Sequence, residues 1–213
     1  MSVFLWTLSF PFLFFSIFLE IFMTKNFRED LDNCLAKINN SEKIPNTLIK
    51  ALVIAEDHRS NFHPGIDPVA IGRTLLFRIK NKNRGGGAST IEQQFSRVIT
   101  GRYERTFIRK FREQMLAIMI SRRMSKSSIA SAYLTVAYYG TGFVGISGLR
   151  EHFDGDLENI SFQQALHVVV FLKYPRPRNP NKAWNRKVAR RTDIILRRLE
   201  SDCYYSTRTK LAD

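Results

Sequence analysis

Apolar residues recur at helical spacing along most of the chain, and this pattern predicts a fold that is mainly α. The segments that carry the pattern are 47–55, 68–80, 89–98, 106–124, 125–139, 161–171 and 185–199. Polar, Gly-rich or Pro-rich breaks separate them at 41–45, 81–87, 140–148 and 174–180. No stretch alternates convincingly between apolar and polar residues, although the Val run in 161–171 leaves a strand open there. We therefore expect one domain of packed helices.

The same spacing predicts which side of each helix is buried. In 106–124 the inward residues are expected to be Phe107, Phe111, Met115, Ile118 and Met119. In the closing helix they are expected to be Val188, Thr192, Ile195 and Leu199. The Ser-x-x-Glu pattern of Ser89 and Glu92 predicts that Ser89 caps the helix 89–98.

The first 19 residues carry no charged side chain and are rich in Phe and Leu, and Glu20 interrupts the run. A run of about 20 residues is typical of a helix that crosses a bilayer. We therefore expect a membrane anchor at 1–24, a connector at 25–44 and the main folded domain at 45–213. A cleaved signal peptide is the alternative, but a basic n-region and an A-x-A-like cleavage site are both missing. Basic residues follow the run, so the positive-inside rule alone would place the body in the cytoplasm.

The charge balance is the most unusual feature of the composition. The chain carries a formal net charge of +14, and the stretch 71–126 holds 14 Lys or Arg residues against three acids. Such an excess predicts an anionic partner, which is a nucleic acid, an anionic membrane surface or a phosphorylated substrate. Two cysteines, Cys34 and Cys203, are too few for a disulfide framework, and we expect unpaired thiols.

Glu56 ends the apolar run 51–55 and opens the segment EDHRSNFHPG. An acid in that position is costly unless it is paired or has chemical work to do. His58 and His63 lie in the same segment, but their spacing matches no zinc pattern, and we expect no His-based metal site.

The segment RKFRE places Arg109 and Lys110 four and three residues before Glu113, on one helix face. Nearby positive charge keeps such a carboxylate ionised. Arginines at 102, 105 and 112 extend the face. An ordinary surface ion pair is one interpretation, and an anion-binding strip is the other.

GGGASTIEQQ places flexible glycines before a helix N-terminus, where free N–H groups favour an anion. A capped helix after a loop is the simpler interpretation. The segment is not a P-loop, because Lys does not follow the glycines at the required position. The chain also lacks the G-x-S-x-G pattern of serine hydrolases.

Four segments in this order resemble the four successive motifs of the peptidoglycan glycosyltransferases, a lysozyme-like domain of class A penicillin-binding proteins and of monofunctional enzymes. The segments are EDHRSNFHPG (56–65), GGASTIEQQ (86–94), RKFRE (109–113) and KSSIASAYLT (126–135). The likeness covers roughly 45–199, and the monofunctional form is the closer match.

The resemblance implies polymerisation of lipid II at the outer face of the bacterial cytoplasmic membrane, with inversion and release of undecaprenyl pyrophosphate. It implies that Glu56 is the general base and that Glu113 is the family's second glutamate. The implied substrate-binding residues are Asp57, Ser89, Gln94, Arg97, Arg105, Arg109 and Lys110. It also implies Mg²⁺ or Mn²⁺ at the pyrophosphate, held mainly by phosphate oxygens, with no organic cofactor. The implied partners are lipid II, the growing lipid-linked glycan and the membrane.

Three positions depart from the family's usual residues. Ser60 stands where Phe is usual, Glu92 where Thr or Ser is usual, and Thr135 where Asn is expected. None of the three removes a catalytic group, but they leave a different lipid-linked acceptor open.

Two other functions fit parts of the sequence. A lysozyme-like hydrolase or lytic enzyme would need no pyrophosphate site, so the basic strip counts against it. A membrane-tethered nucleic-acid-binding protein would suit the charge, but Phe107 and Phe111 fall at core spacing rather than as a stacking series.

Overall fold

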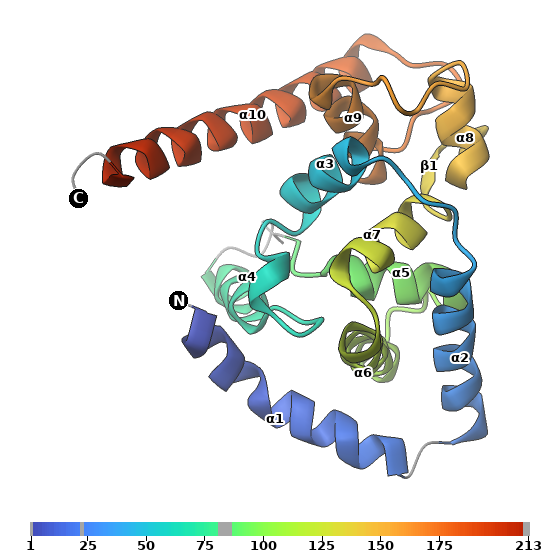
Figure 1. Ribbon diagram of the computed structural model, residues 1–213, viewed down its shortest axis with the longest axis vertical. Coiled ribbons are helices and arrows are strands. Elements are labelled where there is room, and N and C mark those ends of the chain that lie inside the picture. The colour runs from blue at the N-terminus through green and yellow to red at the C-terminus, as the bar shows by residue number, and fades with distance from the viewer. Residues whose placement is uncertain (1, 22–23, 81–86, 211–213) are drawn as a thin grey trace. The chain divides into compact units, whose positions relative to one another are not determined.

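The computed structural model describes residues 2–21, 24–80 and 87–210, and it confirms a mainly helical chain (Figure 1). Its elements are α1 (Ser2–Ile21), α2 (Lys25–Asn39), α3 (Asn46–Glu56), the 3₁₀ turn η1 (Ser60–Phe62), α4 (Pro68–Lys80), α5 (Ile91–Thr100), α6 (Phe107–Arg123), α7 (Lys126–Leu134), β1 (Tyr138–Gly140), β2 (Phe143–Val144), α8 (Gly145–His152), α9 (Phe162–Val169), η2 (Val170–Leu172) and α10 (Lys182–Lys210). Most of the loop expected at 81–87 lies outside the described residues.

The chain groups into two compact units. The first comprises 1–44 and 56–137, and the second comprises 45–55 and 138–213. The first unit contains every residue that the sequence predicts to be functional. The predicted boundaries at 24 and 44 stay a prediction, and α2 shows that much of the connector is helical.

The core of the first unit is the middle of α6. All side chains of 115–120 are almost completely buried, so this part of the helix is apolar on every side. Figure 1 shows α6 nearly end-on, with α1, α2, α5 and α7 around it, and α2, α5 and α1 each pack on it.

The first turns of α6 differ from the prediction. Phe107 is 96% exposed and Phe111 is 44% exposed, whereas Met115, Ile118 and Met119 are buried as expected. Helical spacing identifies a common face but not where the neighbouring helices end. The neighbouring helices leave Phe107 exposed, so its assignment to the core was wrong.

The second unit adds a small hairpin that the sequence pattern did not reveal. Strand β1 occupies the end of the helix predicted at 125–139, and it pairs antiparallel with β2 in the predicted turn region 140–148. Arg176 continues the ladder through backbone hydrogen bonds to Tyr139 and Thr141. Strands of three and two residues are too short to show a periodicity, which is why they were missed. Arg191 of α10 donates to the carbonyl of Ala55, 2.9 Å away, near the end of α3.

The N-terminal run is helical, as α1, and packs on α4 and α6. Glu20 near its end accepts hydrogen bonds from Arg122 and Arg123 of α6. Across the described ranges, no helix has both the length and the apolar character that crossing a membrane requires. The transmembrane assignment of 1–24 is therefore not confirmed.

Gly65 is required by close packing between the first motif and α6. Its φ is +102°, and a Cβ there would lie 2.4 Å from the carbonyl oxygen of Ala117. We expect Gly65→Ala to lower the free energy of unfolding by about 2–4 kcal/mol, because it adds both strain and a backbone clash. Urea denaturation followed by circular dichroism measures this change.

Gly72 in α4 is the matched control, since a Cβ there meets nothing within 4 Å. Gly72→Ala should raise the free energy of unfolding by about 0.5–1 kcal/mol, as Ala replaces Gly inside a helix. Equal effects of the two substitutions would contradict the packing role of Gly65.

Candidate functional site

Glu56 is the last residue of α3 and the first residue of the acidic motif. The side-chain amide of Gln94 donates to its carboxylate, with Nε2 3.3 Å from Oε2. The hydroxyl of Tyr133 in turn donates to Oε1 of Gln94 at 2.9 Å. Hydrogen bonds therefore link three of the four motifs in a path that ends at this carboxylate, although the linked residues are 38 and 39 positions apart along the chain.

Glu113, 4% exposed, lies on α6 and is surrounded by three cations. Arg97 of α5 binds it with two nitrogens, Nε to Oε2 at 3.0 Å and Nη2 to Oε1 at 2.9 Å. Lys110 donates to Oε1 at 2.6 Å, and Arg109 donates to Oε2. The predicted pairing of Glu113 with Arg109 and Lys110 is confirmed, and it is buried rather than an ordinary surface ion pair.

These contacts set the protonation of the cluster. Burial by itself would raise the pKa of Glu113, but hydrogen bonds and positive charge from Arg97 and Lys110 outweigh it and hold that pKa below its ordinary value. The hydrogen bond to Glu113 raises the pKa of Arg97. Burial lowers the pKa of Lys110, and the contact with Glu113 offsets part of that shift. The carboxylate is thus fixed as an anion at neutral pH.

Lys110 also connects this cluster to the Gly-rich segment. Its ammonium group donates to the hydroxyl of Ser89 at 3.1 Å and to Oε1 of Gln93 at 2.9 Å, as well as to Glu113. Ser89 precedes α5, and Gln93 lies in its first turn. The structure therefore brings together five predicted site residues, namely Ser89, Arg97, Arg109, Lys110 and Glu113.

A small pocket opens beside Glu113 and contains four arginines. Its lining is Arg97, Thr100, Arg102, Arg109, Arg112, Glu113 and Leu116. Arg102 and Arg112 also lie within ion-pair distance of Asp30 of α2, at 3.5 and 2.6 Å, and Arg112 stacks on the ring of Phe27. Part of the basic strip thus anchors α2, while Arg97 and Arg109 face Glu113.

Arg105 is exposed in the turn between α5 and α6. Within the described ranges, no hydrogen bond or ion pair joins Arg105 to the Glu113 cluster, so its substrate-binding role stays a prediction.

The carboxylate of Asp57 is directed inward, and its predicted substrate-binding role stays a prediction. The side chain is buried, with Oδ1 3.0 Å from Nε2 of His63 and Oδ2 accepting from the backbone N–H of Ile91 at 3.3 Å. Both oxygens therefore hold the first motif against the start of α5. The same contact identifies His63 as a structural hydrogen-bonding residue, which the sequence favoured.

Glu92 forms a buried ion pair that sequence reasoning missed. Its Oε1 accepts from Lys126 of α7, and its Oε2 has no hydrogen-bond partner in the part of the chain that is described. The predicted cap was wrong, because Thr90 caps α5 by accepting from the N–H of Gln93. Lys126 lies 34 residues from Glu92, so no local spacing could have indicated the pair.

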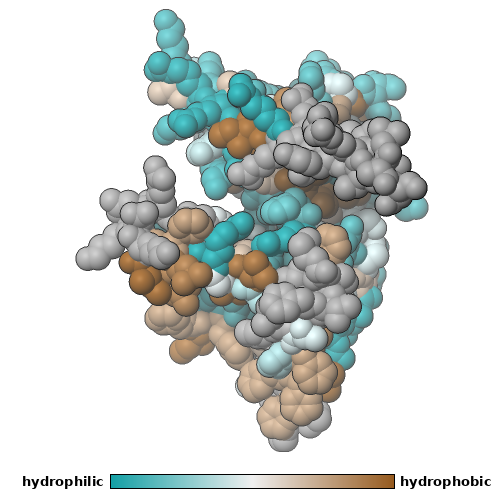
Figure 2. Space-filling model, turned by 90° about the vertical axis from the view of Figure 1, so that its left-hand side faces the viewer, coloured by the Kyte–Doolittle hydropathy of each residue, from teal (hydrophilic) through white to brown (hydrophobic). Residues whose placement is uncertain are grey.

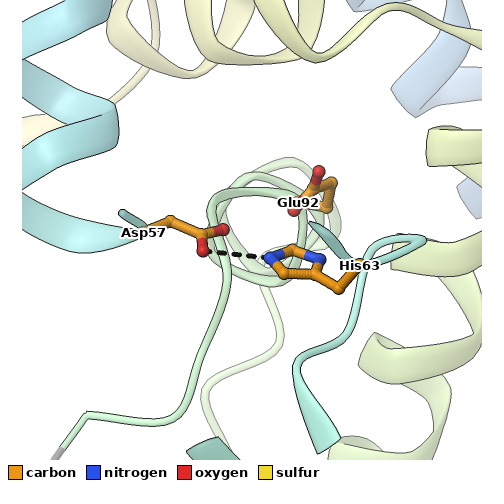
Figure 3. Close-up of side chains that lie close together, drawn as sticks. All are labelled: Asp57, His63 and Glu92. Carbon is orange, nitrogen blue, oxygen red and sulfur yellow. Dashed lines mark hydrogen bonds and ion pairs between the residues drawn. The ribbon is translucent and has the colours of Figure 1, made fainter. Parts of the chain in front are cut away.

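Asp57, His63 and Glu92 lie close together, and each offers a potential metal-ligating atom within 4.8 Å of the others (Figure 3). The surroundings of His63 do not suit a metal. Its Nδ1 accepts from the N–H of Gly65 at 3.3 Å, so the ring proton resides on Nε2 and points at Asp57. A ligating His normally has a hydrogen-bond acceptor beside its other nitrogen, and here that place is taken by a donor.

The other two departures from the family pattern, Ser60 and Thr135, are both buried. Ser60 is buried at the start of η1, and its N–H donates to the carbonyl of Asp57 at 2.8 Å. Thr135 is buried at the end of α7, and its hydroxyl donates to the carbonyl of Ala132 at 2.8 Å. Both positions support local structure.

Comparisons with known proteins agree with this arrangement. The family model described as "Transglycosylase" matches residues 26–200. "Penicillin-binding protein 1A" of Rickettsia typhi is 32% identical over 176 residues, which is 81% of this chain and 22% of that protein. The proteins of the same name from Escherichia coli and Aquifex aeolicus are 32% and 34% identical over 75% of this chain, which is 19% and 22% of their own lengths. The chain thus spans about a fifth of the length of these relatives.

We expect Glu113→Gln to lower the free energy of unfolding at pH 7 by about 3–5 kcal/mol, because three cations lose their shared anion. The lowered pKa of Glu113 has a further consequence. The stabilisation that ionised Glu113 gives the folded state is fully present above the unfolded pKa of about 4.3. It is lost as the pH falls through the lower folded pKa. The free energy of unfolding of Glu113→Gln should therefore fall less than that of wild type when the pH is lowered.

Urea denaturation at pH 7 and at about pH 3 measures both effects. Glu151→Gln is the control, since Glu151 is exposed on α8 and the substitution removes the same charge. Equal stability of Glu113→Gln and wild type at pH 7 would contradict the proposed stabilising role of the cluster.

Proposed function

We propose that this chain, which belongs to the transglycosylase family, polymerises lipid II into the glycan strands of peptidoglycan and releases undecaprenyl pyrophosphate. The observation that carries the proposal is the enclosure of Glu113 by Arg97, Arg109 and Lys110, in the same unit as Glu56 and its hydrogen-bond donor Gln94. Fixed positive charge of this kind suits a substrate whose leaving group is a pyrophosphate.

Glu56 is the general base in this proposal. Its carboxylate takes the proton from the 4-hydroxyl of the acceptor GlcNAc as that oxygen attacks C1 of the donor MurNAc. The new glycosidic bond forms as the bond from C1 to the pyrophosphate oxygen breaks, and the anomeric centre inverts. A neutral donor such as Gln94 orients the carboxylate without removing its capacity to accept a proton.

The cationic cluster serves the leaving group. Arg97, Arg109 and Lys110 carry three positive charges against the single negative charge of Glu113, so an excess remains for the departing pyrophosphate. Fixed cations placed where negative charge develops lower the barrier, because they need little reorganisation during the reaction. A lysozyme-like hydrolase has no comparable need for these cations.

A divalent ion, Mg²⁺ or Mn²⁺, fits this site as a companion of the substrate. Both oxygens of Glu113 are already bonded to cationic side chains, so the ion would be held mainly by phosphate oxygens. When bound, it would neutralise charge on the pyrophosphate.

A lipid-linked substrate also requires a membrane face, and the first unit has exposed apolar side chains for it. Phe107 and Ile108, 96% and 82% exposed, open α6 close to the cationic cluster. Further exposed apolar residues gather on one face over α1 and α4 (Figure 2), namely Phe10, Phe14, Phe18, Leu75, Leu76 and Ile79. We propose that these residues enter the outer leaflet of the cytoplasmic membrane, with the unit on its outer side.

Glu56→Gln should abolish polymerisation of lipid II in the presence of Mg²⁺, because it keeps the shape of the side chain but removes the base. Glu151→Gln should retain full activity. The assay follows glycan polymer on gels and, in parallel, fragments released from finished peptidoglycan. Polymer formation by Glu56→Gln would refute the role of the base, and release of fragments without polymer would identify a hydrolase.

Replacing Phe107 and Ile108 together by Asp should reduce binding to phosphatidylglycerol–phosphatidylethanolamine vesicles by about tenfold or more. The reason is that two apolar side chains proposed to enter the membrane become charged. Val144→Asp is the control, because Val144 is 51% exposed but lies on the hairpin of the second unit. Vesicle co-sedimentation measures the binding. Unchanged binding of the double variant would exclude this part of α6 from the membrane face.

A further inference from the structure

We propose that Tyr133 is a positioning residue that acts through Gln94 to hold the carboxylate of Glu56 in its reactive orientation. The inference rests on the proposed role of Glu56 as the base, and it assigns a task to the fourth motif. Tyr133 does not contact Glu56 by a hydrogen bond of its own in this arrangement. Its hydroxyl donates to Oε1 of Gln94 at 2.9 Å, and Nε2 of Gln94 donates to Oε2 of Glu56 at 3.3 Å.

The direction of the Gln94 amide determines whether it supports or repels the carboxylate. Only the NH₂ end can donate to Glu56, and the carbonyl end would place one negative oxygen against another. A hydroxyl that donates to Oε1 stabilises the supportive orientation, because it occupies the end of the amide that faces away from Glu56. Without that hydroxyl, rotation of the amide by 180° costs much less.

Tyr133 is suited to be a permanent donor. Burial, with the negative charge of Glu56 as a smaller cause, raises the pKa of Tyr133 well above its ordinary value. Arg97 of α5 also faces the hydroxyl and opposes this shift, and Tyr103 in the turn after α5 adds to it. The phenol therefore remains protonated throughout the working range of the enzyme.

The helices α5 and α7, which carry Gln94 and Tyr133, are joined by further contacts. The last residues of α7, 129–134, are all buried. Lys126 at the start of α7 binds Glu92 of α5, two residues before Gln94 along the chain. The hydroxyl of Ser131 accepts from the N–H of Ile44 at 3.1 Å, which fixes α7 on its other side. Tyr133 and Gln94 thus keep a constant separation, which a positioning contact requires.

Kinetics on lipid II provide the first test. Tyr133→Phe keeps the ring and removes only the donor, and we expect kcat to fall about tenfold with little change in KM. Loss of amide support disfavours the carboxylate, so the acid limb of the kcat–pH profile should move to higher pH. Tyr138→Phe is the control, because Tyr138 is 51% exposed and lies outside the first unit.

A double-mutant cycle shows whether Tyr133 acts through Gln94. Gln94→Met removes the amide, so adding Tyr133→Phe to it should cause no further loss of kcat. Independent, multiplying effects of the two substitutions would overturn the proposal. Thermal unfolding of each variant confirms that the fold is retained.

Carbon-13 NMR of the glutamate carboxyl groups tests the same inference without substrate. The signal of Glu56, assigned with Glu56→Gln, should titrate at higher pH in Tyr133→Phe and in Gln94→Met than in wild type and Tyr138→Phe. An unchanged titration in Tyr133→Phe would overturn the positioning role. If the titration shifts but the protein forms no polymer, the proposed function is rejected. The positioning of Glu56 by Tyr133 through Gln94 is then still supported.

Discussion

Neutralisation of a buried carboxylate by three cations is the interaction on which the first unit depends. Glu113 projects from the helix that forms the centre of the core, so its charge must be compensated where solvent does not reach. Arg97 provides a two-nitrogen contact from α5, while Arg109 and Lys110 provide contacts from α6 itself. The ion cluster therefore joins the two helices that carry most of the candidate site, and its side chains are the ones that we propose to bind the substrate.

The two glutamates differ because their partners differ. Glu113 is bonded to permanent cations and is held as an anion. Glu56 has the neutral amide of Gln94 beside it, itself fixed by Tyr133. In the reaction we propose, Glu56 is the base that accepts a proton, and the cations around Glu113 form the positive region for a departing pyrophosphate. Lys110 joins the cationic cluster to the start of α5, since it reaches Ser89 and Gln93 as well as Glu113.

The first motif contains as much structural as chemical information. Asp57 follows Glu56 directly, yet its carboxylate turns inward to His63 and to the N–H of Ile91. Gly65 brings the same segment against the backbone of α6. The unusual Glu92 adds an ion pair between α5 and α7 at a position where a small hydroxyl residue is the family's usual choice. These contacts keep Glu56 in place relative to the cationic cluster.

Much of this protein follows from the sequence alone, because local forces act over a few residues. Helical spacing and capping residues predicted α4 in full and α6 to within a residue at each end, and a spacing of three and four residues predicted the partners of Glu113 on its own helix. Contacts between distant segments required the tertiary structure. The pairing of Arg97 with Glu113, the Glu92–Lys126 ion pair and the path from Tyr133 to Glu56 join residues 16 to 39 positions apart. Only the packing of α5 between α6 and α7 determines which side chains meet there, and the same packing leaves Phe107 in solvent although its spacing indicated the core.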